Sequence, residues 1–323
     1  MKKFLAILLA MVMVCSLSAV AFADYPEKGI TAINPWGAGG GTDNCLRAFC
    51  ASLEKELGQT ITVDNLTGAG GVIGHEAIAD AEADGYTIGM ITWEISSYLP
   101  LEMSEYTYEN YIPLCRVNTD AAAVTVGAKW AADNNITDLA SFIDYCKAHP
   151  GEVQMGGSSS GSVWHVAGGY LMNAADIEIK MITYGDGAAA AVKAAAQGEI
   201  QGVTVSAAEA RSFVESGDLL MLGVMDDVRN DLFPDVPTCA EQGFECYYAT
   251  QRGMAVPLGT DEAIVAKLEA ACQAAAESDE FVEAMANLGQ KIAFQNSADY
   301  TEYLKQSAED VPAAMLVVGL IEE

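Results

Sequence analysis

Short strand-like segments and longer helical segments alternate along almost the whole of this chain of 323 residues. Alternation of this kind favours α/β layers with mainly parallel sheets, because a helix is the usual connection between two parallel strands. The length exceeds that of one typical domain and suits two lobes of about 100 to 150 residues each.

Hydrophobic periodicity gives the positions of these segments. The expected strands cover residues 29–34, 61–63, 87–92, 123–126, 153–155, 180–183, 201–205 and 219–225. The expected helices cover residues 42–57, 71–81, 138–148, 162–174, 188–197, 207–216, 261–275, 279–288 and 297–311.

Two glycine-dense turns each open one of these helices. The first runs from Asn34 to Asp43, and the second runs from Met155 to Ser162. Glycine lets the backbone approach a ligand closely, and the first turn of a helix offers unpaired N–H donors with a partial positive charge. Two such turns that face each other would hold an anion.

The N-terminus has the pattern of a secretory signal peptide. Lys2-Lys3 precedes an apolar run from Phe4 to Leu17, and Ala21-Phe22-Ala23 forms a small-residue cleavage site. The apolar run is short for a membrane span. We therefore expect residues 1–23 to be removed after Ala23 on export, which leaves 300 residues (323 minus 23); an uncleaved anchor is the alternative.

The exported chain is strongly acidic. Without Lys2 and Lys3, the 16 basic residues fall to 14 against 45 acidic residues, a formal charge of −31. Such a surface keeps a protein soluble and repels nucleic acid and anionic lipid. We expect no nucleic-acid partner, and any bound carboxylate must be held by local, short-range donors.

The number and spacing of the cysteines do not predict a full set of disulfides. Of eight cysteines, Cys15 lies in the leader, and the remaining odd number includes no C-x-x-C pair. Export permits disulfides, and Cys239 with Cys246 is the best local pair. The alternative, which we favour, is a set of buried, unreactive thiols.

Two enzyme motifs are matched only in part. Residues 37–43 approach G-x-G-x-x-G, but Thr42 stands in place of the third glycine, and the chain has no Gly-Lys-Ser/Thr. Residues 157–161 satisfy G-x-S-x-G, but the histidine that follows is His165, in the helix that the motif itself would start. A serine hydrolase therefore lacks a suitable base, and we expect no enzyme and no catalytic residues.

The histidines and tryptophans allow two interpretations each. The histidines are too scattered for a metal site, so we expect no metal and no cofactor. His75 and His149 are expected at the surface or in caps, whereas His165 could line a cleft. Near the strand-to-helix turns, a tryptophan either packs in the core or walls a pocket and excludes water. The tryptophans concerned are Trp36, Trp93 and Trp164.

In its two glycine-dense turns and in several other short motifs, the chain resembles the substrate-binding proteins of tripartite tricarboxylate transporters, the TctC or Bug receptor family. The likeness extends over essentially the whole exported chain. It is carried by short motifs in the family's order: Tyr25-Pro26, Gly39 to Asp43, Gly68-Ala69-Gly70-Gly71, Asp84-Gly85-Tyr86-Thr87, Gly161-Ser162 with His165, Phe233 to Thr238, Glu241-Gln242-Gly243 and Pro257-Leu258-Gly259-Thr260.

The resemblance implies an α/β, two-lobed periplasmic-binding-protein fold of the type II-like kind, with two crossover segments. Lobe 1 would comprise residues 24–120 and 245–323, and lobe 2 would comprise residues 121–244. In the family, main-chain amides and hydroxyls of the two loops hold a ligand carboxylate. The residues expected to bind the ligand are Trp36, Gly39, Gly40, Gly41, Thr42, Asp43, Trp93, Ser158, Ser159, Ser160, Ser162, His165, Tyr184 and Asp186.

Two acids depart from the family pattern near the expected pocket. Where the family commonly reads Pro-Tyr-Lys-Gly-Gly, this chain has Asp186 within residues 183–187, and Glu94 stands where small or hydroxylated residues are frequent. Glu94 and Asp186 either hold an ammonium group of an amino acid or point to solvent, and we favour the second.

The sequence therefore predicts a periplasmic solute receptor that captures a small carboxylate: a di- or tricarboxylate, an aromatic acid or an acidic amino acid. As the resemblance implies, it would deliver this ligand to the permease subunits of a membrane transporter, and we expect a monomer. A secreted serine hydrolase and a sensor that serves a signalling partner stay open as alternatives.

Overall fold

The computed structural model describes residues 25–185 and 187–322. The expected leader, residues 1–23, and Asp186 lie outside the described residues. Within the described ranges, no helix is both long and apolar enough to cross a membrane.

The helices and strands follow the expected alternation closely. The strands are β1 (Ile30–Asn34), β2 (Ile61–Asn65), β3 (Thr87–Thr92), β4 (Tyr111–Gly127), β5 (Gln154–Gly156), β6 (Lys180–Ile182), β7 (Gly202–Ser206), β8 (Leu219–Val224), β9 (Ala249–Pro257) and β10 (Lys291–Asn296). The α-helices are α2 (Gly41–Leu57), α3 (Val72–Ala79), α4 (Ala128–Asp133), α5 (Leu139–Ala148), α6 (Val163–Ala175), α7 (Ala188–Ala196), α8 (Ala207–Ser216), α9 (Glu262–Glu277), α10 (Asp279–Leu288) and α11 (Ser297–Val317). The 3-10 helices are η1 (Ala69–Gly71), η2 (Trp93–Ser96), η3 (Tyr108–Asn110) and η4 (Ala240–Gln242).

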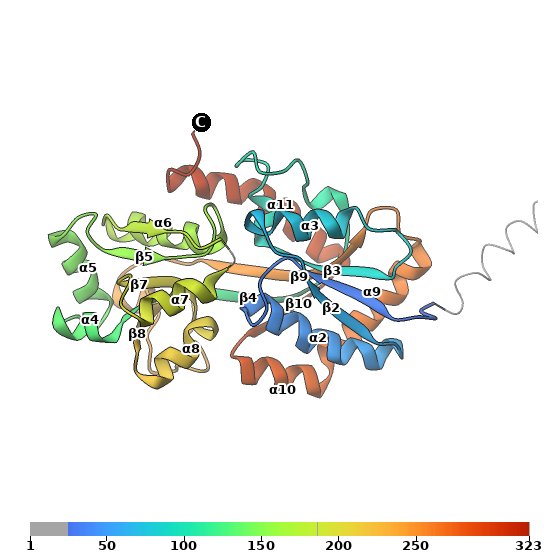
Figure 1. The fold of residues 1–323 in the computed structure, drawn as a ribbon, viewed down its shortest axis with the longest axis horizontal. Coiled ribbons are helices and arrows are strands. Elements are labelled where there is room, and N and C mark those ends of the chain that lie inside the picture. The colour runs from blue at the N-terminus through green and yellow to red at the C-terminus, as the bar shows by residue number, and fades with distance from the viewer. Residues whose placement is uncertain (1–24, 186, 323) are drawn as a thin grey trace, which may run out of the picture.

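The strands join in one sheet that both lobes share. Its order is β2-β1-β3-β9-β4-β7-β5-β6, and β8 and β10 also pair with β4. The long strand β4 pairs with β9 up to Ala121 and with β7 from Ala122 onward. It is the first crossover, and the chain returns through Tyr248 into β9. Figure 1 shows lobe 2, with α4 to α8, on the left and lobe 1, with α2, α3, α9 and α10, on the right.

The two-lobed α/β fold with two crossovers is therefore present, but the expectation of mainly parallel sheets is wrong. Among the described strands, parallel ladders join β1 to β2 and β3, and β5 to β6 and β7. Strand β9 pairs antiparallel with β3 and β4, and β7, β8 and β10 pair antiparallel with β4. The reason is that β4 and β9, the strands that carry the crossovers, lie at the centre of the sheet and run antiparallel to each other.

In lobe 1, helices cover both faces of the sheet because apolar residues of one strand point to both sides. Ile30 and Ala32 of β1 belong to a core that includes residues of α2, α9 and α10. Ile33, the next residue along β1, belongs to a core with residues of α3 and α11. Successive strand side chains point to opposite faces, so β1 places apolar residues on both faces of the sheet.

Helix α11 links the two lobes. Tyr300 and Leu304 pack in a lobe 1 core, whereas Val311, Ala314 and Met315 join the core of lobe 2. Figure 1 shows α11 extending across the top of the molecule toward α6. The division at residues 24–120, 121–244 and 245–323 stays a prediction.

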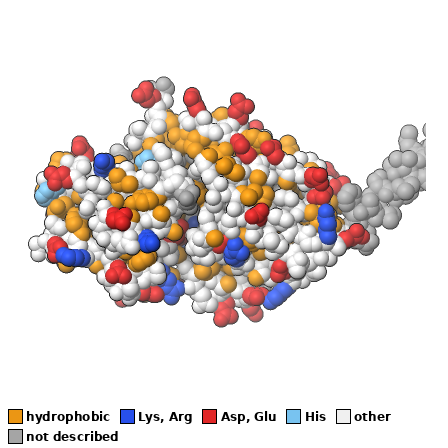
Figure 2. Space-filling view, in the orientation of Figure 1, with side chains coloured by type: hydrophobic (Ala, Val, Ile, Leu, Met, Phe, Trp, Pro, Cys, Tyr) orange, Lys and Arg blue, Asp and Glu red, His pale blue; other side chains and the backbone are white. Residues whose placement is uncertain are grey.

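The cysteines of the described residues are buried thiols outside any disulfide. Burial raises the pKa of the Cys239 and Cys246 thiols to about 12, so both stay protonated and unreactive. The acidic surface that the composition implies is seen in Figure 2, where Asp and Glu side chains are spread over both lobes.

Candidate functional site

A cavity of 70 Å³ lies between the lobes, and residues of both glycine-dense turns line it. Lobe 1 contributes the turn before α2, and lobe 2 contributes the serine turn with the starts of α6 and α7. Of the expected residues, the lining includes Trp36, Gly40, Gly41, Thr42 and Ser158. The two turns therefore face each other, as an anion clamp requires.

A second cavity, of 410 Å³, adjoins the first. Both are lined by Gly40, Gly41 and Glu209. Gly39 lines only the second cavity, together with residues of α2, α8 and α10. The space between the lobes thus widens from the small inner cavity past the glycine turn.

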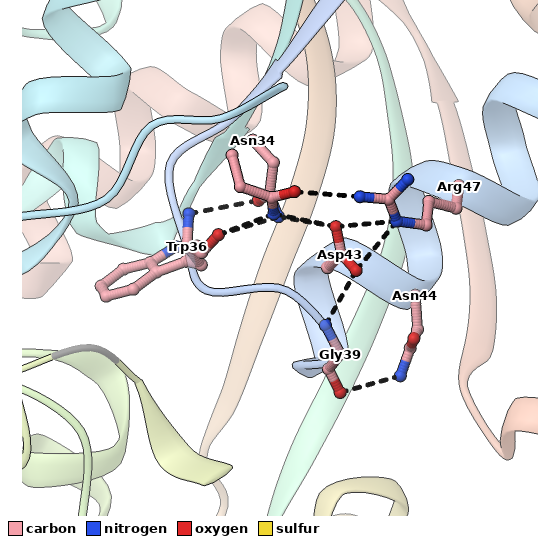
Figure 3. Close-up of polar contacts among 7 residues, drawn as sticks. Asn34, Trp36, Gly39, Asp43, Asn44 and Arg47 are labelled. Atoms are coloured by element: carbon pink, nitrogen blue, oxygen red, sulfur yellow. Dashed lines mark hydrogen bonds and ion pairs between the residues drawn. The ribbon is translucent and has the colours of Figure 1, made fainter. Parts of the chain in front are cut away.

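Asp43, in the first turn of α2, fixes the backbone of the glycine turn through hydrogen bonds (Figure 3). Its carboxylate accepts hydrogen bonds from Gly39 N at 2.8 Å, from Asn65 Nδ2 at 2.9 Å and from Arg47 Nε at 3.0 Å. Burial alone would raise the pKa of Asp43, but these hydrogen bonds outweigh it and hold the pKa below its usual range. Asp43 does not belong to the described lining of the inner cavity, so it positions the turn.

Arg252 of β9 lines the inner cavity and was missed by the sequence analysis. Its Nε donates to Thr42 Oγ1 at 3.0 Å, and its Nη1 lies 3.2 Å from Asn118 Oδ1 and 3.4 Å from Asp120 Oδ2. The side chain is 3% exposed. Because Nη2 makes no hydrogen bond to another described residue, Arg252 keeps one donor group for a ligand.

Three carboxyl groups lie around this single guanidinium. Burial raises the pKa of Asp120, although Arg252 opposes the shift. Burial also raises the pKa of Glu94, against hydrogen bonds from Thr92 and Val163. The pKa of Glu209 is raised to about 7 by burial, with Arg252 again opposing. Desolvation thus dominates at each acid, and the cavity holds more acids than cations.

Two of these acids reach across the cavity to a helix start in the opposite lobe. Glu94 Oε1 of lobe 1 accepts a hydrogen bond from Val163 N at the start of α6, at 3.3 Å. Glu209 Oε1 of lobe 2 accepts one from Gly41 N at the start of α2, at 3.4 Å. Each carboxylate therefore lies where the helix dipole favours negative charge.

Glu94 is 3% exposed, so the interpretation of this residue as a solvated acid is wrong. Its Oε2 accepts a hydrogen bond from Thr92 Oγ1 at 2.5 Å. The short helix η2 begins directly after β3 and turns the side chain inward toward the cavity. Asp186, the other acid in question, lies outside the described residues.

Of the expected serines, only Ser158 lines the inner cavity in the described residues. Its Oγ donates to Ser162 Oγ at 2.6 Å, and Ser162 is the buried N-cap residue of α6. Ser159 is half-buried outside the lining, and Ser160 is exposed. Tyr184 is also outside the lining and packs against the core of lobe 2.

His165 belongs to the frame of the serine turn. Its Nδ1 accepts a hydrogen bond from Gly161 N at 3.0 Å, and burial lowers the pKa of the imidazole. The hydroxyl of Ser158 is bonded to Ser162, so the described hydrogen bonds do not join a serine of the turn to this histidine. In the described ranges, no group of three or more His, Cys, Asp or Glu residues is placed to hold a metal ion.

The tryptophans divide between the two interpretations. Trp36 and Trp164 line the inner cavity, and Trp36 Nε1 donates to Thr92 Oγ1 at 3.3 Å. Trp93 is buried outside this lining and packs on Tyr248, with ring centroids 6.0 Å apart.

His75 was expected at the surface or in a cap, but it is fully buried, and burial lowers its pKa to about 4.

Comparison with known proteins identifies the family. The family model described as "Tripartite tricarboxylate transporter family receptor" matches residues 45–315. The chain belongs to this receptor family. The expected family is thereby confirmed over most of the chain, and its members act as solute receptors.

Individual members of the receptor family agree with this result. Protein BugT of Bordetella pertussis is 31% identical over 299 residues, which cover 90% of this chain and 89% of that protein. The structure of the periplasmic binding protein BugD covers 93% of this chain and all (100%) of that chain, with 25% identity and a TM-score of 0.84. Rpa4515 of R. palustris, solved with adipate, has the same fold, with 23% identity, 91% and 98% coverage and a TM-score of 0.85.

Proposed function

We propose that this chain is an extracytoplasmic receptor that takes a small carboxylate into the cavity between its lobes and delivers it to the permease subunits of a tripartite tricarboxylate-type transporter. The observation that carries the proposal is the inner cavity, which loops of both lobes line and in which Arg252 keeps a donor group. A ligand in that position contacts both lobes and so favours their closure.

Family members support the carboxylate. Rpa4515 was solved with adipate, and a second R. palustris protein, MatC, was solved with malate. In this chain the proposed donors are Arg252 Nη2, the hydroxyl of Thr42 and the start of α7, while Gly40, Gly41 and Ser158 line the site. Trp36 and Trp164 would wall the site and exclude water, which strengthens these contacts.

Thermal unfolding of the exported chain with a panel of di- and tricarboxylates, aromatic acids and amino acids tests the binding. A ligand at about 100 times its dissociation constant stabilises the folded state by roughly 2.7 kcal/mol. We expect at least one carboxylate to do so, and a folded protein that no carboxylate stabilises would contradict the proposal.

Delivery is tested separately by uptake of the ligand into cells of the source organism with and without the gene. Loss of uptake on deletion, restored by the intact gene, is expected of a transport receptor. Unchanged uptake in the deletion strain would contradict delivery while leaving binding intact.

A further inference from the structure

Resting on the proposed function, we propose that the ligand carries an ammonium group beside its carboxylate, so that the preferred solutes are α-amino acids rather than plain carboxylates. The charges of the inner cavity carry this inference. Arg252 is already paired with Asp120, at 3.4 Å. Glu94 and Glu209 face the same cavity, and neither forms an ion pair with a described residue.

A plain dicarboxylate would add two negative charges to this cavity. Two unpaired carboxyl groups already line it, and like charges repel strongly where water is excluded. An ammonium group between Glu94 and Glu209 would instead supply the missing counter-charge. The geometry therefore selects against ligands that bring only negative charge.

The helix starts lead to the same conclusion. The starts of α2, α6 and α7 line the cavity, and the first two already receive a carboxylate of the protein: Gly41 N of α2 bonds to Glu209, and Val163 N of α6 bonds to Glu94. The third, at the start of α7, contributes Ala188 to the lining. This helix start, the Thr42 hydroxyl and Arg252 Nη2, which donates to no other described residue, would together receive one ligand carboxylate.

Glu209 keeps acceptor capacity for the ammonium group. Its two contacts are long, 3.4 Å to Gly41 N and 3.5 Å to Ser206 Oγ, and a carboxylate accepts about four hydrogen bonds. The 70 Å³ of the inner cavity suits the ammonium and carboxylate groups, and the adjoining cavity of 410 Å³ has room for a side chain.

Calorimetry with matched ligand pairs tests the inference. Each pair differs only in the α-ammonium group: L-alanine and propionate, L-aspartate and succinate, L-glutamate and glutarate, L-phenylalanine and 3-phenylpropionate. For the best-bound pair at pH 7 we expect the amino acid to bind at least about a hundredfold more tightly, because the acid leaves buried acceptors unpaired.

The sign of the proton exchange gives an independent readout. Arg252 of β9 and Asp120 of β4 are the charged groups that act on Glu209. Glu94 of η2 lines the same cavity, and Arg211 lies on the same helix as Glu209. A bound ammonium group favours the ionised form of Glu209, so binding near pH 7 should release protons. A plain dicarboxylate should cause proton uptake instead. Titrations in HEPES and in Tris, which differ in ionisation enthalpy, measure the sign.

Matched variants assign the effect to these two side chains. Glu94→Gln and Glu209→Gln should each weaken the amino acid at least about tenfold without weakening the plain acid, and Glu209→Gln should also remove the proton release. Glu199→Gln, at an exposed position of lobe 2, should change neither quantity.

The outcomes separate this inference from the function on which it rests. A plain acid that binds as tightly as its amino acid partner, or an amino acid that binds with proton uptake, overturns the ammonium site and leaves the carboxylate receptor standing. Absence of binding by every acid and amino acid of the panel to a folded protein overturns both.

Discussion

The carboxylate of Glu94 accepts a hydrogen bond from the backbone N–H of Val163, across the cavity, at 3.3 Å. The contact from Glu209 to Gly41 is its counterpart in the opposite direction. The lobes of this protein thus hold each other through their own acids at the positions where an anion would bind.

Glu209→Gln should remove a pH-dependent loss of stability. The pKa of Glu209 is raised from 4.5 to about 7 by burial. Between these values the unfolded chain releases a proton that the folded chain retains, so the free energy of unfolding falls as the pH rises. The variant should therefore become more stable than the wild type over this range, by on the order of 1 to 3 kcal/mol at pH 7 and above.

Urea denaturation of both proteins between pH 4.5 and pH 8 measures this difference. Glu199→Gln should follow the wild type at every pH. A constant difference between Glu209→Gln and the wild type across the range would show that Glu209 titrates normally in the folded protein.

Gly41→Ala should weaken ligand binding more than Gly40→Ala does. A Cβ at Gly41 would lie 2.8 Å from Arg252 Nη2 and 3.3 Å from Glu209 Oε1, whereas a Cβ at Gly40 would approach only Gly37 O, at 3.4 Å. Gly40 has an ordinary φ of −77°. We expect about a tenfold loss for Gly41→Ala, or 1.4 kcal/mol, measured by calorimetry; equal losses in both variants would contradict the role of the guanidinium.

Asp43→Asn should destabilise the fold near neutral pH and much less in acid. The folded-state pKa of Asp43 is held below its usual range, so its contribution is present above the usual pKa and is lost as the pH falls. We expect a loss of about 1 to 3 kcal/mol at pH 7 in denaturant titrations. The exposed Asp64 of β2 is the control position, and an Asp43→Asn difference as small as that of Asp64→Asn would refute the role of Asp43.

Ser158→Ala should reduce binding or stability, and Ser160→Ala should do neither. Ser158 lines the cavity and is buried with its hydroxyl bonded to Ser162, whereas Ser160 is exposed. The lost hydrogen bond corresponds to about 1 kcal/mol. Thermal shift with and without ligand compares the two variants, and a silent Ser158→Ala would mean that the turn binds through its main chain.

Most helices and the outer strands were predictable because their apolar residues follow the expected period. Residues 111–122 of β4 and all of β9 and β10 were missed. Strand β4 carries Asn118 and Asp120, which are buried, and β9 carries Arg252 opposite Asn118 in the register. Buried polar residues in a central strand look like an exposed strand face or a loop in the sequence, so hydrophobic periodicity does not find them.

The same reason explains the part of the site that was missed. The glycine and serine turns can be predicted from their local composition. Arg252 and Glu209 reach the cavity only because distant strands pair and because α8 packs beside it. One signal was available for Arg252: it is one of few basic residues in an acidic chain, and it stands next to the apolar run 254–257. Glu209 follows Ser206 at capping distance, and this local role conceals its reach across the cavity.

Helix α11 has a consequence for how tightly a solute can be held. It packs in the cores of both lobes, with Pro312 inside the helix beside the residues that join lobe 2. Separation of the lobes therefore requires that α11 bends or that its residues leave one of the two cores. The apparent affinity of a receptor is its intrinsic affinity scaled by the fraction of molecules in the competent shape. Substitutions in α11, which contributes no described residue to the lining of either cavity, should therefore change the apparent affinity for the solute and its rate of release.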